Sequence, residues 1–265
     1  MSLLNLLTAD VRIDLTTTDD EVMAGIRDVM DAWVVDGATR PDLTLTARHV
    51  QGGGRRAVGA ALAQIVSDVD HAAMAATPCL AIHAACVAGA AGAILVPGAS
   101  GVGKSTLAAA CMQSGMTLLS DEAACLRRDE AVVVPHARPL GLSAVSRRLL
   151  GLVVADTEAD DNEVGLSPSV IGRPADARAS FNVAMIALPR RARSAHAELV
   201  PVTAATALAG LLANCLNVPG QGPSASWTSG DAWRRLAALV TGVPTMALAY
   251  DDPHAAATVL GAALR

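Results

Sequence analysis

The stretch PGASGVGKSTL, residues 97 to 107, contains the residue types that bind nucleotide phosphates. Gly98, Gly103, Lys104 and Ser105 fill the pattern G-x-x-x-x-G-K-[ST], in which the glycines let backbone N–H groups turn inward around phosphate oxygens. The lysine supplies positive charge to the β- and γ-phosphates, and the serine hydroxyl is a ligand for Mg²⁺. We therefore expect a nucleotide to contact the whole loop, which consists of Gly98, Ala99, Ser100, Gly101, Val102, Gly103, Lys104, Ser105 and Thr106.

Two adjacent carboxylates, Asp121 and Glu122, end the apolar stretch LLSDE. A carboxylate at such a position holds Mg²⁺ in other phosphate-loop enzymes. Two adjacent carboxylates are suited to divide these tasks, with one near the metal and the other accepting a proton from an attacking hydroxyl. The alternative is a strand-end turn that carries two solvated acids.

His83 lies in the apolar run AIHAACV, before the loop. A histidine in such a run is usually an ordinary core residue. If the runs CLAIHAACVAG and GAILVPG form a hairpin, however, the imidazole approaches the γ-phosphate. Both interpretations stay open at this point.

The elements around these residues alternate between strand and helix, which is typical of an α/β protein. The apolar run 77–96 predicts two buried strands, and Lys104 to Ser114 predicts a helix that Gly115 ends. Further along we expect strands at 181–189, 197–202 and 245–250, and helices at 203–216, 229–242 and 252–265.

A soft boundary near residue 76 separates two predicted domains. Residues 1–76 are expected to form a small N-terminal α+β lobe, with one helix capped by Asp19 or Asp20 and a second helix near 57–75. Residues 77–265 are expected to form the ATP-binding catalytic domain. The segments 49–56 and 154–180 are rich in glycine or polar residues; the first is interpreted as a turn or mobile loop and the second as a long loop or a mobile lid.

Composition excludes several classes of function. The net charge of −5 and the scarcity of aromatic residues argue against a nucleic-acid partner. The start of the chain has no basic segment typical of a signal peptide, and no stretch is clearly a membrane span. Five cysteines without metal-site spacing predict buried free thiols in a reducing compartment. We therefore expect a soluble cytoplasmic protein with no membrane partner.

The segments IHAACV, GASGVGKS and GMTLLSDE together resemble the catalytic domain of the bacterial HPr kinase/phosphorylase family. The resemblance is strongest over residues 80–127. The later segments PHARPLGLS and VPTMALAYDD look like a branch of relatives that includes lasso-peptide precursor kinases.

This resemblance implies a phosphate-loop fold akin to the phosphoenolpyruvate carboxykinases, with a mixed central sheet. It implies ATP and Mg²⁺ as cofactors and phosphoryl transfer to a serine hydroxyl. Glu122 falls on the family's base and Asp121 lies nearer the metal, while His83 lies near the γ-phosphate. The family has Asp where this chain has Glu122, which leaves open which acid is the base. Some relatives are hexamers, so a homo-oligomer is possible.

The chain also departs from the family. A later E-x-R-G stretch has no counterpart, and the corresponding region PHARPLGLSAVSRRLLG is basic. This departure calls into question HPr as the substrate and the reverse phosphorolysis reaction. Other charged groups are open to more than one interpretation. Arg138, Arg147 and Arg148 either meet a phosphate or an acidic substrate, or lie in a turn and on a solvated helix face. Arg190, Arg191 and the acidic run 156–163 are interpreted as solvated surface.

The sequence therefore predicts an ATP-dependent kinase that phosphorylates a hydroxyl of a peptide, protein or small molecule. One alternative is a small-molecule kinase with a purely parallel sheet of order 2-3-1-4-5, closed by a lid arginine, Arg173 or Arg178. Another is a nucleotide-binding module without catalysis. The acceptor is not identified, and its pocket is expected among the loops 49–56, 135–143 and 154–180.

Overall fold

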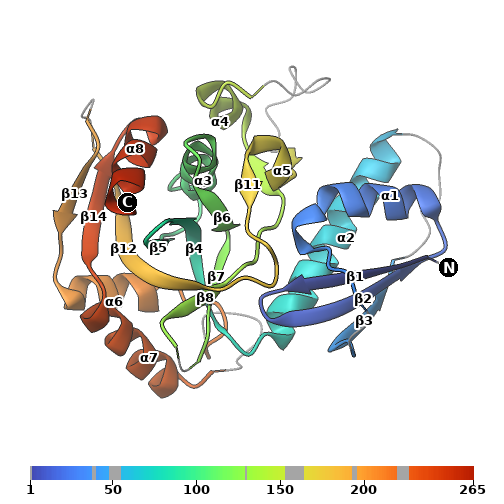
Figure 1. Ribbon diagram of the computed structural model, residues 1–265, viewed down its shortest axis with the longest axis horizontal. Helices are drawn as coiled ribbons and strands as arrows, with labels where there is room; N and C mark the ends of the chain where they lie inside the picture. The colour runs from blue at the N-terminus through green and yellow to red at the C-terminus, as the bar shows by residue number, and fades with distance from the viewer. Residues whose placement is uncertain are drawn as a thin grey trace.

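The computed structural model describes residues 2–37, 40–47, 55–128, 130–152, 164–192, 196–219 and 227–265. We call residues 2–76 the N-terminal lobe and residues 77–265 the core domain. The two parts lie beside each other, with the lobe to one side of the large central sheet (Figure 1). Most of the glycine-rich segment 49–56 and the acidic run 156–163 lie outside the described residues.

The N-terminal lobe is a three-stranded sheet covered by two helices. Strands β1 (Ser2–Thr8) and β2 (Val11–Thr17) form an antiparallel hairpin, and β3 (Leu43–Thr46) pairs with β2 in parallel. The turn residues Ala9 and Asp10 have φ of 52° and 60°, the left-handed pair that a tight two-residue hairpin needs. Leucine, isoleucine and valine side chains of β1 and β2 pack against α1 (Asp20–Val29) and α2 (Arg55–Ala76).

The predicted cap of the first helix is confirmed at Asp19. Its carboxylate accepts hydrogen bonds from the N–H groups of Glu21 and Val22, which have no partner within the helix itself. After α1 the chain forms a short 3₁₀ turn, η1 (Asp31–Trp33), whose Trp33 is buried in the hydrophobic core of the lobe.

The core domain has a nine-stranded sheet that contains both parallel and antiparallel pairs, so the predicted mixed central sheet is confirmed. Strands β4 (Leu80–Gly89) and β5 (Gly92–Pro97) form the expected antiparallel hairpin. The order is β11-β6-β4-β7-β8-β12-β14-β13, and β5 pairs with β4 and, in parallel, with β12. The other strands are β6 (Thr117–Ser120), β7 (Ala123–Leu126), β8 (Val132–Val134), β11 (Arg173–Pro174), β12 (Phe181–Arg191), β13 (Glu198–Pro201) and β14 (Thr245–Tyr250).

This sheet is not the purely parallel one expected for the small-molecule kinase alternative. Strand β4 runs antiparallel to its neighbours β5, β6 and β7. The sheet order that would have favoured that alternative is therefore not found.

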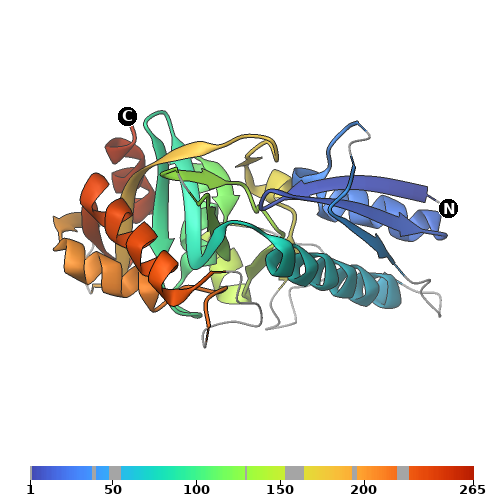
Figure 2. The same cartoon turned by 90° about the horizontal axis from the view of Figure 1, so that it is seen from below.

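Helices cover both faces of the central sheet (Figure 1; Figure 2). Because side chains alternate along a strand, Ala85 and Val87 of β4 face one layer and Ala84 and Cys86 face the other. The first layer consists of α3 (Lys104–Gln113) and α8 (Pro253–Ala263). The second consists of α6 (Ala204–Leu212) and α7 (Ser229–Gly242).

The predicted end of the loop helix is also confirmed. Gly115 has a φ of 93°, and the N–H of Met116 bonds to the carbonyl of Cys111, as in a glycine-terminated helix. All five cysteines are buried and form no disulfide, as the sequence predicts.

The interpretation of 154–180 as a loop is wrong for most of residues 164–174, which form strands and a short helix. Strand β10 (Val164–Leu166) pairs with β9 (Leu140–Leu142), and α5 (Pro168–Ile171) starts at a proline that suits a first helical turn. Strand β11 then joins the edge of the central sheet beside β6. These elements pair with segments far away in the sequence, so a local polar composition did not reveal them.

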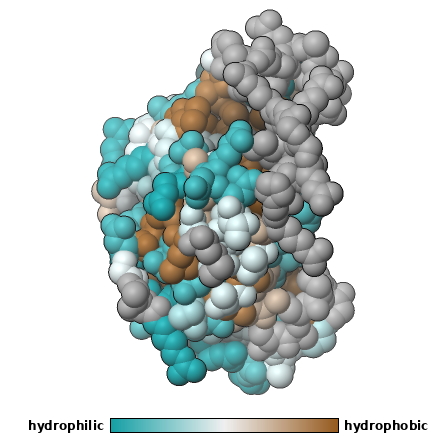
Figure 3. Space-filling view, turned by 90° about the vertical axis from the view of Figure 1, so that its right-hand side faces the viewer, coloured by the Kyte–Doolittle hydropathy of each residue, from teal (hydrophilic) through white to brown (hydrophobic). Residues whose placement is uncertain are grey.

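The surface of the N-terminal lobe mixes hydrophilic and hydrophobic residues. In the view onto this end of the molecule, the coloured side chains are interspersed, and the apolar ones form more than one separate patch (Figure 3). Within the described ranges, no helix combines the length and the apolar character needed to cross a membrane.

Candidate active site

The phosphate-loop sequence forms the connection between a buried strand and a helix. Strand β5 ends at Pro97, and α3 begins at Lys104 with Gly103 as its N-cap residue. Gly101 and Gly103 have φ of 82° and 93°, a region in which a side chain would be strained. The backbone N–H groups at the start of a helix are free to bind an anion, so this connection is suited to hold phosphate.

Lys104 is the only lysine in the chain. Its side chain is buried, and its Nζ donates hydrogen bonds to the carbonyls of Gly98 and Ala99 at 2.8 and 3.1 Å. Burial lowers the pKa of Lys104, and the charges of Glu122 and Asp121 oppose that shift. The ammonium group is therefore held inside the loop, within electrostatic reach of both acids.

Strand β4 brings the loop, His83 and the acidic pair together. On one side, the carbonyl of His83 accepts a hydrogen bond from the N–H of Gly98, at 3.2 Å. On the other side, His83 is the register partner of Ala123, and the N–H of Ala84 bonds to the carbonyl of Glu122 at 3.1 Å. Strand β4 thus brings the loop and the acidic pair to opposite sides of His83.

The acids occupy a break between two strands that both pair with β4. Strands β6 and β7 pair with different halves of β4, and residues 121–122 connect them. The buried hydroxyl of Ser120 accepts hydrogen bonds from the N–H groups of Glu122 and Ala123, at 3.2 and 2.9 Å. The serine of LLSDE therefore shapes the turn that presents the carboxylates, as short hydroxyl side chains do in turns.

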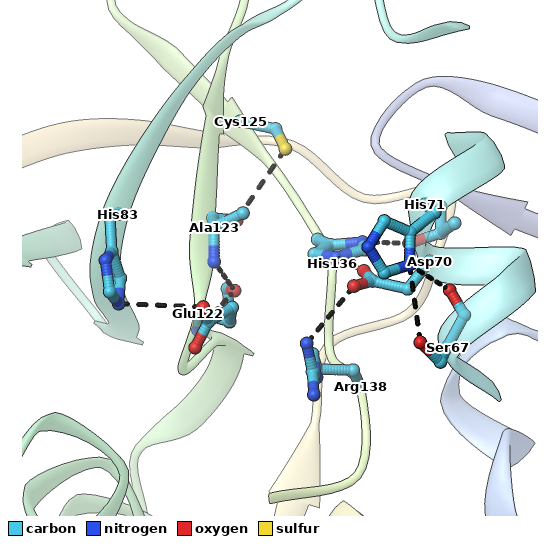
Figure 4. A network of polar contacts seen from close by, with 11 residues as sticks. Ser67, Asp70, His71, His83, Glu122, Ala123, Cys125, His136 and Arg138 are labelled. Carbon is cyan, nitrogen blue, oxygen red and sulfur yellow. Dashed lines mark hydrogen bonds and ion pairs between the residues drawn. The ribbon is translucent and has the colours of Figure 1, made fainter. Parts of the chain in front are cut away.

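The two adjacent acids have different surroundings. Asp121 is 3% exposed, and burial raises its pKa to about 6, although the Ser105 hydroxyl acts in the opposite direction. Glu122 is 43% exposed at its side chain, and its Oε1 lies 3.6 Å from Nε2 of His83 (Figure 4). Burial lowers the pKa of His83, more than the neighbouring Glu122 raises it. Asp121 is thus a buried acid next to the loop, and Glu122 an accessible one facing a neutral imidazole.

The contacts of Asp121 and Ser105 fit a bound Mg²⁺. Among the described residues, Asp121 Oδ1 is one of two buried side-chain polar atoms without a hydrogen-bond partner. A buried carboxylate oxygen beside a serine hydroxyl supplies the hard oxygen ligands that Mg²⁺ prefers. The part of the chain that the structure describes has no cluster of three or more acidic, histidine or cysteine side chains that could hold a metal alone. Such a site would depend on phosphate oxygens for its remaining ligands, as is usual for Mg²⁺.

A cavity of about 860 Å³ adjoins the loop, and neither Asp121 nor Glu122 is among its lining residues. A volume of this size is in the range of small-molecule and cofactor sites. Its walls come from the loop, from α4 (Ala144–Leu149) and from the segment between β14 and α8. The lining residues are Gly101, Val102, Gly103, Thr106, Ser143, Val145, Ser146, Leu149, Arg191, Tyr250, Asp251, Asp252 and Pro253.

Sequence reasoning missed most of this lining outside the loop. Arg191 is exposed, as expected, but it borders the cavity instead of a featureless surface. From the sequence, the segment LAYDD indicates only the closing strand and the resemblance to a branch of relatives, and it does not predict that Tyr250, Asp251 and Asp252 line a cavity. The available signal was the pair of acids, Asp251 and Asp252, directly after a strand. The same signal identified Asp121 and Glu122.

The three arginines of the basic region have three different surroundings. Arg147 is buried and donates to the carbonyl of Leu142, so its interpretation as a solvated helix face is wrong. Arg148 is exposed on α4. Arg138 bonds to Asp70 of the N-terminal lobe.

The proposed lid arginines of the small-molecule kinase alternative lie elsewhere. Arg173 and Arg178 line a separate cavity of about 370 Å³ together with Asp31 and Asp36. Neither arginine borders the cavity at the phosphate loop.

Neither a protein-family model nor a curated protein sequence matches the chain. Among solved structures, the HPr(Ser) kinase/phosphatase from Coxiella burnetii is similar to it, with 11% sequence identity and a TM-score of 0.32. That similarity covers 68% of this chain and 93% of the other. A likeness of this size assigns no role to any residue, so the roles below rest on the contacts described above.

Proposed function

We propose that the protein is an ATP-dependent kinase that transfers the γ-phosphoryl group to a hydroxyl, with serine as the preferred acceptor. The observation that supports this most is the convergence on β4 of the loop, of His83 and of two acids in unlike surroundings. A module that only binds nucleotide has no need of an accessible carboxylate beside the phosphates.

In this proposal each residue near the loop has a separate role. The loop backbone and Lys104 bind the phosphates, and Ser105 and Asp121 hold Mg²⁺. When bound, Mg²⁺ neutralises phosphate charge and orients the β- and γ-phosphates. Glu122 accepts the proton of the acceptor hydroxyl. The oxygen of that hydroxyl bonds to the γ-phosphorus, while the bond from the γ-phosphorus to the bridging oxygen of ADP breaks. Catalysis would then come mainly from positioning and charge stabilisation.

His83 acts through Glu122. Since burial lowers its pKa, the imidazole is neutral at pH 7 and does not hold the carboxylate as an ion pair. Glu122 therefore stays available as a base. Nε2 of the His83 ring lies 3.6 Å from Oε1 of Glu122, so the ring limits the directions in which the Glu122 side chain can turn.

Replacing Glu122 by glutamine tests the assignment of the base. The amide has nearly the same shape but cannot accept the acceptor's proton, so we expect turnover to fall about 10²-fold while nucleotide affinity stays the same. Single-turnover transfer and calorimetric binding of a non-hydrolysable ATP analogue measure the two effects separately. Unchanged turnover would assign the base to another group.

The nucleoside half of ATP is expected in the cavity of about 860 Å³, against the exposed apolar side chains of Val145 and Leu149 on α4. Replacing Leu149 by aspartate should weaken binding of the ATP analogue about 10-fold, because a leucine covered by ligand contributes on the order of 1 to 2 kcal/mol. Val170→Asp is the matched control, since Val170 is also exposed and apolar but does not line this cavity. Equal losses in both variants would place the nucleoside elsewhere.

Incubation with γ-labelled ATP separates a kinase from a binding module. Peptides that end in serine are the first acceptors to try, with alanine-terminated peptides as controls and hydroxyl-bearing small molecules as the second set. The proposal predicts label on the serine peptides alone. Nucleotide binding without a labelled product across both sets would favour the module. Cytoplasmic location and homo-oligomer formation stay predictions from the sequence.

A further inference from the structure

Asp70 reaches from α2 of the N-terminal lobe into the core domain. Its Oδ1 lies 2.7 Å from Nε2 of His136, and its Oδ2 accepts a hydrogen bond from Nη1 of Arg138 at 3.1 Å (Figure 4). His136 is completely buried, is stacked on Trp33 and lies 2.8 Å from the hydroxyl of Thr8. The carboxylate of Asp70 is therefore tied to a buried contact between the two parts of the protein.

Arg138 lies close to the acidic pair. The N–H of His136 bonds to the carbonyl of Leu119 at 2.7 Å, so the segment carrying Arg138 runs beside the end of β6, just before Asp121. Arg138 is close enough to Asp121 for its positive charge to act on that carboxylate. In Figure 4 the guanidinium group of Arg138 points toward the side on which Glu122 lies.

Most of the donors of this guanidinium are uncommitted. Within the described part of the chain, Asp70 is the one side chain that hydrogen-bonds or ion-pairs with Arg138, and Arg138 is one third exposed. A guanidinium has five N–H donors in a planar fork that matches phosphate oxygens. Two acids next to a phosphoryl group also need compensating positive charge, and Arg138 adds one unit to that of Lys104 and of the proposed Mg²⁺.

We propose that Asp70 is a positioning residue that holds Arg138 beside the acidic pair, where its remaining donors bind the phosphoryl group being transferred. This inference rests on the proposed kinase function and adds to it a residue that touches the phosphoryl group. It also gives the N-terminal lobe a part in the reaction, since its Asp70 orients that residue.

The chain contains a matched control for this contact. Arg127 and Asp10 also pair across the boundary between the lobe and the core domain, through two hydrogen bonds of 2.7 and 3.0 Å. Arg127 follows the end of β7 that is remote from Glu122. Variants of Arg127 and Asp10 therefore show how turnover changes when a contact between the lobe and the core domain is lost away from the acidic pair.

We would measure turnover and the affinities for MgADP and for the Mg²⁺ complex of a non-hydrolysable ATP analogue. Arg138→Ala should lower kcat about 10²-fold and remove the advantage of the analogue over ADP, because the lost donors bind the γ-phosphoryl group. Arg138→Lys should recover part of both effects, since it restores the charge without the fork.

The aspartate is tested by coupling. Asp70→Asn should lower kcat about 10-fold, and Asp70→Asn combined with Arg138→Ala should be no worse than Arg138→Ala alone, because Asp70 acts through Arg138. Arg127→Lys and Asp10→Asn should change kcat less than about 2-fold. Thermal unfolding of every variant separates these effects from loss of the fold.

Additive losses in the double variant, or equal losses in the Arg127 and Asp10 variants, would overturn the inference. So would an unchanged preference for the analogue over ADP in Arg138→Ala. If the unaltered protein produces no phosphorylated product, the proposed function fails, and the affinity comparison still decides whether Arg138 binds a terminal phosphate.

Discussion

Replacing Lys104 by alanine is expected to lower phosphoryl transfer by about 10³-fold or more. In the proposed function the ammonium group is the charge that meets the β- and γ-phosphates, and it lies in a buried site where water screens charges poorly. Removing one such charge-stabilising donor from an active site typically costs two to three powers of ten in rate (on the order of 10² to 10³). The measurement is single-turnover transfer from labelled ATP. Full activity in this variant would refute the assignment of the loop.

The single lysine offers an independent check on the same residue. An ATP analogue with an amine-reactive acyl phosphate should label Lys104 and, apart from it, only the α-amino group, because the chain has no other lysine. Excess MgATP should protect Lys104 and leave the α-amine unprotected. Labelling of Lys104 that ATP does not reduce would mean that the phosphates bind away from the loop.

Replacing Asp121 by asparagine is expected to lower turnover about 10³-fold and to stabilise the protein without Mg²⁺ and nucleotide. The loss of turnover follows from removing the carboxylate that, in the proposed function, would hold Mg²⁺ with Ser105. The stabilisation follows from the pKa of Asp121, which burial raises to about 6 in the folded protein from 3.8. An opposite movement of activity and stability is typical of a group kept for function.

The effect of Asp121 on the free energy of unfolding depends on pH, and its sign follows from the raised pKa. Because the folded protein binds the Asp121 proton more tightly than the unfolded chain does, stability falls as pH rises from about 4 to about 6. Above that window the ionised carboxylate costs about 3 kcal/mol. The free energy of unfolding of Asp121→Asn relative to the unaltered protein should therefore rise by about that amount between pH 4 and pH 7.

Urea unfolding at a series of pH values, without Mg²⁺ and nucleotide, measures this difference. Glu122→Gln is the matched control, since it changes the neighbouring acid, whose side chain is 43% exposed. A difference between Asp121→Asn and the unaltered protein that does not vary with pH would show that the carboxylate is not buried as described.

Much of the candidate site was predictable from the sequence because it depends on local chemistry. The glycines of the loop, the helix that starts at Lys104 and the stop at Gly115 follow from the φ values that only glycine adopts freely and from the pattern of small apolar residues. The hairpin of β4 and β5 follows from two apolar runs separated by a short turn. A mixed sheet was expected from the resemblance, and the pairing of β4 confirms it.

What the sequence could not determine are the contacts between segments far apart in the chain. Whether His83 faces the core or the acids depends on the register of β4 against β7, and the different burial of Asp121 and Glu122 depends on what packs over each. Strand pairing and burial are decided by tertiary packing, which local residue preferences constrain only weakly.

The same reason explains the residues that the sequence did not reveal. Leu149, Tyr250 and Asp252 line the cavity beside the loop from separate elements, and Asp70 reaches Arg138 from the other part of the protein. The sequence by itself determined that this chain has a loop suited to phosphates and two acids to accompany it. Only the tertiary structure decided which side chains surround them, because that depends on how distant strands and helices pack together.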